Sequence, residues 1–168
     1  YLALSCTTAD GSPAEIKISA SEELCLNLRG EGTVAGETIA FRGGKAVKMG
    51  NTEQKPLWRS GDNVRIDWGY FWLAAKGNAD TSFIDGSDGM KYAVLKKTVT
   101  SGENALIMFA YDDTESIEYF GKRLRSVWNS KGKTIEEALA DAAEDWVKLE
   151  RRADEFSKEL RTDATLAG

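Results

Sequence analysis

The side chains that could perform chemistry are few, and histidine is absent from all 168 residues. This excludes a Ser/His/Asp triad, a Cys–His pair and any metal site that depends on a histidine ligand. Two thiols remain, Cys6 and Cys25, and neither has the histidine partner that usually activates a cysteine nucleophile. Asp67, beside Trp68, is the only carboxylate inside an apolar stretch, and we expect an arginine or a backbone amide to satisfy it. We therefore predict no catalytic residue.

Two further motifs have the composition of ligand-binding loops but lack the residues that such loops require. The glycines between residues 30 and 50 precede no Gly-Lys-Ser/Thr and no helix, so they predict turns between edge strands and not a phosphate loop. The acidic turn at residues 85–89 lacks the register of a calcium loop and its bidentate glutamate. The sequence therefore predicts no cofactor and no metal.

Asp67 lies in the stretch that organises the predicted fold, residues 64–75, which reads VRIDWGYFWLAA. One face of this predicted strand is apolar throughout: Val64, Ile66, Trp68, Tyr70 and Trp72. The other face becomes apolar in the second half, which is typical of a central strand in a sheet covered on both faces. Gly69 indicates a bulge or a neighbouring side chain that lies across it. We predict that Trp68 and Trp72 are core residues.

The first 20 residues are predicted to form a β-hairpin around the turn residues Asp10-Gly11-Ser12. A three-residue loop would pair Cys6 with Ile16 and Leu4 with Ile18 on the core face. Cys25 has the opposite parity and lies ~30 Å along the strand from the partner of Cys6. A disulfide requires Cα atoms within about 7 Å, so both cysteines are predicted to be free thiols.

Four further short apolar runs predict strands, and residues 51–60 predict a loop that crosses between them. The strands are expected at residues 38–41, 81–84, 90–99 and 104–111. Together with the first hairpin and the central strand, they predict a mainly β fold, an antiparallel β-sandwich over residues 1–112.

The pattern changes to helical spacing at Thr114, and residues 113–168 are predicted to be a helical extension that connects to a following domain. A C-terminal helical hairpin is expected: its first helix covers residues 114–127, and residues 129–132 end that helix. Thr134 and Glu137 form a capping box that starts a second, long helix. Its apolar seam keeps steps of four and three over about 27 residues, or ~40 Å. The members of the seam are Ile135, Leu139, Ala142, Trp146, Leu149, Ala153, Phe156 and Leu160.

The bulk composition is that of a globular domain, with 42% hydrophobic and 29% charged residues. The net charge of −5 argues against a nucleic-acid or membrane partner, and no apolar run approaches the ~20 residues of a membrane span. The chain has no initiating Met and opens in a predicted strand, so we expect a piece of a longer protein. Its oligomeric state is left open.

Several of these segments resemble one known family. They are the opening YLALSCTTADGSPAEIKISASEELCLN, the strand RIDWGYFWLAA, and AYDDTESIEYFGKRLRSVW followed by a long helix ending in DATLAG. The chain resembles the β-sandwich domain, often described as a domain of unknown function, in the N-terminal half of the glutaminase A-like proteins of fungi and gut Bacteroidetes. The resemblance implies a super-sandwich type of fold, a helical toroid domain after residue 168, and a secreted or periplasmic location.

Two functions from different classes follow. The resemblance implies a non-catalytic domain of a larger hydrolase that converts glutamine to glutamate and ammonia, packing against the following helical domain and shaping its cleft. The alternative is a carbohydrate- or ligand-binding module, which an exposed planar row of tryptophan rings would favour. An apolar seam left bare on the long helix would favour the packing domain, and we expect Trp146, Phe156 and Leu160 to make the interdomain contact.

Overall fold

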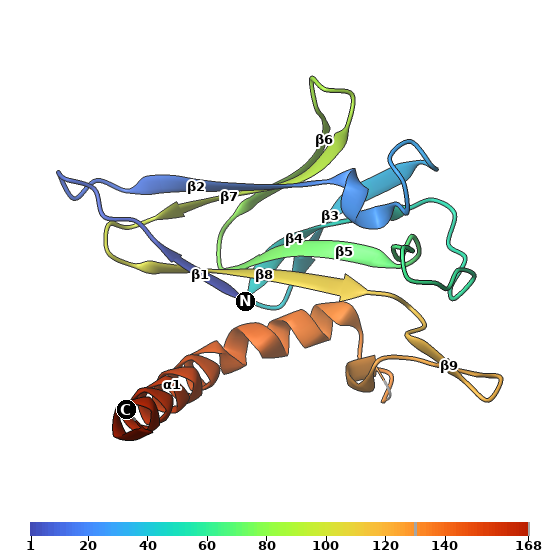
Figure 1. Cartoon of the computed structure of the whole chain (residues 1–168). Coiled ribbons are helices and arrows are strands. Elements are labelled where there is room, and N and C mark those ends of the chain that lie inside the picture. Colours follow the sequence, from blue (N-terminus) through green and yellow to red (C-terminus); the bar gives the residue numbers. More distant parts are fainter. Residues whose placement is uncertain (130, 168) are drawn as a thin grey trace.

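The structure is a computed structural model and describes residues 1–129 and 131–167. It has three layers: a three-stranded sheet, a five-stranded sheet beneath it, and a long helix below the larger sheet (Figure 1). The strands are β1 (Leu2–Ser5), β2 (Ala14–Ser21), β3 (Val34–Phe41), β4 (Gly44–Asn51), β5 (Tyr70–Lys76), β6 (Asp80–Asp85), β7 (Lys91–Val99), β8 (Asn104–Asp112), β9 (Ile117–Tyr119) and β10 (Lys122–Leu124). The helices are the 3₁₀ helices η1 (Glu22–Cys25) and η2 (Val127–Asn129) and the α-helix α1 (Ile135–Ala167).

All strand pairs are antiparallel. The larger sheet has the order β1-β8-β5-β4-β3, the smaller has β2-β7-β6, and β9 pairs with β10 in a separate hairpin. β5 is the central strand of the larger sheet, flanked by β4 and β8. The predicted mainly β fold, an antiparallel sandwich followed by a long C-terminal helix, is confirmed.

The larger sheet is covered on both faces because β5 sends apolar side chains in both directions. Phe71, Leu73 and Ala75 face the smaller sheet and belong to the core between the two sheets. Trp72 and Ala74 face the helix and belong to a second core, closed by Ile135, Leu139, Ala140 and Ala143 of α1. Trp68 and Trp72 are both buried, which confirms the prediction that they are core residues.

The strand at residues 64–75 is shorter than predicted, because regular pairing begins only at Tyr70. Val64 and Ile66 are exposed, and side chains satisfy the backbone that precedes the strand. The Arg65 amide donates to Oδ1 of Asn27 at 3.0 Å, and the Trp68 carbonyl accepts from the Tyr111 hydroxyl at 2.8 Å. The alternation of apolar residues therefore begins several residues before the first paired residue of β5.

The predicted hairpin of residues 1–20 is wrong, although its turn exists. The Ser12 amide donates to Oδ1 of Asp10 at 3.0 Å, which forms an Asx turn at the predicted place. The segments on either side enter different sheets: β1 pairs with β8 and β2 pairs with β7. Leu4 and Ile18 still face the same core, but from opposite layers. Alternation predicted the buried face correctly and could not identify the neighbouring strand.

The predicted helix at residues 114–127 is also wrong, so α1 is not half of a helical hairpin. The segment forms β9 and β10, joined by Phe120 and Gly121 with φ of +48° and +73°. Positive φ at both positions is typical of a two-residue type I′ turn. The four apolar residues of the predicted stripe are all exposed: Ile117, Phe120, Leu124 and Val127. The predicted break at 129–132 includes residue 130, which lies outside the described residues.

The long helix begins where its capping box predicts. The Glu137 amide donates to Oγ1 of Thr134 at 3.3 Å, and the Thr134 amide donates to Oε2 of Glu137 at 2.9 Å. α1 contains 33 residues and is about 50 Å long. Over the described residues, no helix has the length and apolar character that crossing a membrane requires. The division into a sandwich over 1–112 and an extension over 113–168 stays a prediction.

Candidate functional site

The carboxylate of Asp67 is part of a buried polar cluster, in which two neighbouring side chains contact it. Its side chain is only 6% exposed and lies 3.3 Å from Nε of Arg59. The indole Nε1 of Trp58 donates to the other carboxylate oxygen at 2.9 Å. The guanidinium of Arg59 also stacks on the Trp58 ring, 4.0 Å from its centroid. This cluster fixes the loop before β5, as expected for a carboxylate satisfied by an arginine.

The two cysteines are free thiols, as predicted. Cys25 is fully buried between the sheets, and its thiol donates to the Met49 carbonyl over 3.5 Å. Burial raises the pKa of this thiol from 9.0 to about 11, which keeps it neutral at ordinary pH. A neutral, buried thiol is a poor nucleophile.

The acidic turn between β6 and β7 uses its own carboxylate to close the turn. Asp88 accepts from the Met90 amide at 3.1 Å and from the Tyr92 hydroxyl at 2.5 Å. These hydrogen bonds hold the pKa of Asp88 below its usual value. Among residues 1–129 and 131–167, no group of three or more His, Cys, Asp or Glu side chains could hold a metal ion.

Within the described residues, helix α1 contacts the sandwich through its N-terminal part, from Ile135 to Trp146. Ile135 and Leu139 are buried against the larger sheet, and Lys76 donates to the Ala143 carbonyl at 3.2 Å. Arg42 pairs with Asp141 and Glu144 at the surface. Trp146 is half-buried, and its ring centroid lies 5.3 Å from that of Tyr1. Trp146 therefore packs on its own sandwich.

Beyond Glu150 the helix extends away from the sheet and presents its seam to solvent (Figure 1). Residues 151–166 are all exposed. We define the distal seam as Ala153, Phe156 and Leu160; Phe156 is 65% and Leu160 58% exposed. The structure thus separates the three residues expected at an interdomain contact: Trp146 touches the sandwich, whereas Phe156 and Leu160 touch solvent.

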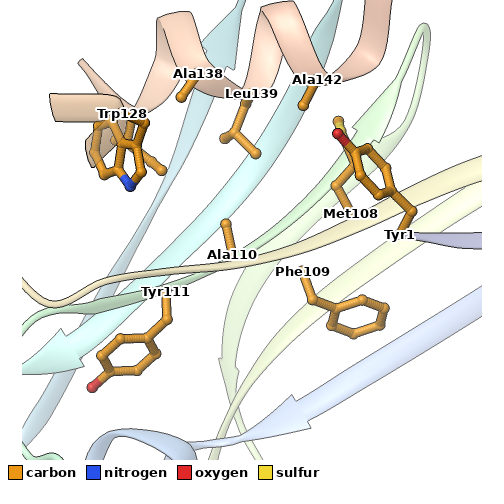
Figure 2. Close-up of a pocket in the computed structure, with 10 residues that line it drawn as sticks. Tyr1, Met108, Phe109, Ala110, Tyr111, Trp128, Ala138, Leu139 and Ala142 are labelled. Carbon is orange, nitrogen blue, oxygen red and sulfur yellow. The ribbon is translucent and has the colours of Figure 1, made fainter. Parts of the chain in front are cut away.

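A second apolar feature is a groove of about 270 Å³ between β8 and α1, which we call the β8 groove. Figure 2 shows Met108 and Ala110 pointing from β8 toward the helix, where Leu139 and Trp128 face them. Phe109 and Tyr111 point to the opposite side of the strand. The groove therefore runs along the edge of the larger sheet, with apolar walls on both sides.

The sequence did not predict the β8 groove or the partner of Asp67. The groove was missed because its walls come from β8, η2 and α1, which are separate in the sequence, and because residues 114–127 were expected to be a helix. Arg59 was missed because it lies in the predicted crossing loop, eight residues before Asp67. Its position next to Trp58, in a polar segment before an isolated strand carboxylate, is the signal that could have indicated it.

Comparison with known proteins yields one family. The model of a family described as a domain of unknown function (DUF5127) matches residues 89–163. The matched stretch begins just before β7 and includes β8, the β9–β10 hairpin and the distal seam. It also includes the residues of β8 and α1 that line the β8 groove. No curated protein and no solved structure matches the chain.

Proposed function

We propose that this chain is a non-catalytic β-sandwich domain of a larger glutaminase-like hydrolase. In that protein the distal seam of α1 packs against a helical domain that follows in the same polypeptide and helps to shape its cleft. The glutaminase parentage, and with it a secreted or periplasmic location, rests on the sequence resemblance. The packing role rests on the structure of α1.

The observation that carries the packing role is the exposure of Phe156 and Leu160. Fully burying a side chain of this size stabilises a protein by roughly 1.5–3 kcal/mol. Exposure of both side chains therefore leaves a large stabilising free energy unused in this chain. Both lie on the same face as Ile135 and Leu139, which are buried. The seam therefore continues past the end of the domain's own sheet and is suited to a second surface.

The chemistry of the site supports a non-catalytic role. Asp67 is bound by Arg59 and Trp58, and the thiol of Cys25 is buried and neutral. The purified chain should therefore release no ammonia from glutamine and no sugar from simple glycosides. Ammonia release that one point substitution within the chain abolishes would contradict this proposal.

The aromatic residues give less support to the alternative, a carbohydrate-binding module. Trp68 and Trp72 are buried, and Trp128 and Trp146 are half-buried against α1 and the sheet. Trp58 is half exposed, but its ring is covered by Arg59 and its indole N–H is bound to Asp67. These five tryptophans do not form an exposed planar row.

The packing role is tested with Phe156→Glu and Leu160→Glu together. In the 168-residue chain both positions are exposed, so the free energy of unfolding should change by no more than about 0.5 kcal/mol. In the longer polypeptide the same double variant should separate the unfolding of the sandwich from that of the next domain. Lys158→Ala with Thr162→Ala, on the opposite side of the same turns, is the matched control and should leave one transition.

Two results would contradict the packing role. One is a longer polypeptide in which the double glutamate variant unfolds like the control. The other is a large loss of stability in the 168-residue chain itself, because it would show that the distal seam already contributes to its own sandwich.

A further inference from the structure

The two neighbours of β8 cover different parts of this strand. On the inner side, β5 pairs with Ile107–Asp112; on the outer side, β1 pairs only with Asn104–Ile107. Within the described part of the chain, residues 108–112 therefore have no strand on their outer side. We call this segment the open edge of β8. The outward backbone groups of such an edge are a template for a further strand.

The surroundings of the open edge are apolar on both faces of the sheet. On the face toward α1, Ala110 forms the floor of the β8 groove below Leu139 and Trp128 (Figure 2). On the other face, Phe109 is 45% exposed although its ring lies 6.3 Å from that of Phe71 in the core. A strand placed here would cover apolar side chains above and below as well as pair its backbone.

We propose that the polypeptide segment directly preceding Tyr1 forms this strand, continuing β1 along the open edge. Continuity with the existing β1–β8 pairing carries the proposal. Leu2 lies opposite Ile107, so the same register places Tyr1 opposite Met108. Tyr1 packs on Trp146 and Met108 faces the helix core, which puts both side chains on the α1 face, as opposite residues in an antiparallel pair require. The backbone at Tyr1 is therefore already directed along the edge.

The register also determines what the preceding residues contact. The four residues before Tyr1 lie opposite Phe109, Ala110, Tyr111 and Asp112 in that order, moving away from Tyr1. Because side chains alternate, the first and third point toward the smaller sheet, beside Phe109 and Tyr111. The second points toward α1 and enters the β8 groove. At about 270 Å³, the groove has room for a large apolar side chain at that second position.

This strand is independent of the proposed packing of α1, since it concerns the opposite end of the chain and the other end of the helix. Its test is amide hydrogen exchange at residues 108–112. The 168-residue chain is compared with a longer chain that retains the native residues encoded upstream of Tyr1. Two controls have the same length: one carries a Gly/Ser segment in place of the upstream residues, and one carries proline at the first and second upstream positions.

The native upstream segment should slow exchange of the outward amides among residues 108–112 by on the order of tenfold or more. The Gly/Ser and proline controls should leave them fast, and residues 104–107 should exchange equally in all four chains. Equal exchange at 108–112 with and without the native segment would overturn the proposal. So would protection in the 168-residue chain that increases with protein concentration, because a second copy would then occupy the edge. A mature polypeptide that begins at Tyr1, shown by mass spectrometry, would overturn it as well.

Discussion

The rings of Tyr1 and Trp146 lie 5.3 Å apart between centroids and are tilted by 41°. Tyr1 precedes β1, at the edge of the larger sheet, and Trp146 lies where α1 leaves that sheet. This contact therefore marks the boundary between the part of the helix that belongs to the sandwich and the part that extends beyond it.

The Tyr1–Trp146 contact should contribute measurably to helix docking. A double-mutant cycle with Tyr1→Ala and Trp146→Ala should give a coupling energy of about 0.5–1.5 kcal/mol, the range for aromatic pairs. Val147→Ala, one residue further along the helix and exposed, is the control and should show no coupling with Tyr1→Ala. Chemical denaturation of the four chains provides the free energies, and additive effects would contradict the contact.

Trp72 should be among the most sensitive positions of the sandwich. It is buried in the core between the larger sheet and α1, so Trp72→Ala should lower the free energy of unfolding by about 3–5 kcal/mol. Phe120→Ala, at a side chain that is 88% exposed, should change it by less than about 1 kcal/mol. Similar losses in the two variants, measured by urea unfolding, would show that the second core is not formed.

Gly69 should tolerate no side chain. Its φ is +83°, and a Cβ there would collide with the Asp112 carbonyl at the end of β8. Gly69→Ala should therefore cost more than the roughly 1–2 kcal/mol of a left-handed alanine alone. Gly102 has the same φ of +83° with open space around it, so Gly102→Ala measures the conformational cost without the collision. Thermal unfolding that shifts equally in both variants would refute the close approach.

The stability of the domain should fall at alkaline pH. Burial raises the pKa of Cys25 to about 11, whereas the unfolded thiol ionises near 9.0, so the unfolded state loses its proton first. The contribution is complete below about pH 9 and is lost as the pH rises toward 11, by about 3 kcal/mol. Burial also raises the pKa of Tyr111, which acts in the same direction. Cys25→Ala should flatten the pH dependence of unfolding; an unchanged slope in this variant and in Tyr111→Phe would contradict the assignment.

The elements predicted from sequence are those whose pattern and boundary signals agree. The central strand β5 was predicted because its dense aromatic and aliphatic residues are typical of a buried strand. The helix α1 was predicted because its capping box and its apolar spacing both indicate a helix. The first hairpin failed because the turn at Asp10 connects two layers of the sandwich and not two neighbours in one sheet. Sequence periodicity reports which side of a strand is buried, but the partner strand depends on tertiary packing.

The segment 114–127 failed for a different reason. Ile117, Phe120, Leu124 and Val127 have helical spacing, yet all four are exposed, so no buried face selects a helix. Positive φ at Phe120 and Gly121 instead forms a tight turn, so the segment folds into the β9–β10 hairpin. The long helix that carries the apolar seam was predicted, and the β8 groove was not, because its walls come from segments far apart in the sequence.

The measurement that tests the central claim most directly is amide hydrogen exchange at residues 150–162, in this chain and in a longer polypeptide that includes the proposed following domain. If the distal seam packs against that domain, these amides should exchange quickly in the 168-residue chain, where residues 151–162 are all exposed, and be protected in the longer protein. The amides of Leu139–Ala143, which already pack on the sandwich, should exchange alike in both. Equal exchange at 150–162 in the two proteins would contradict the proposed packing, and α1 would then serve only its own sandwich.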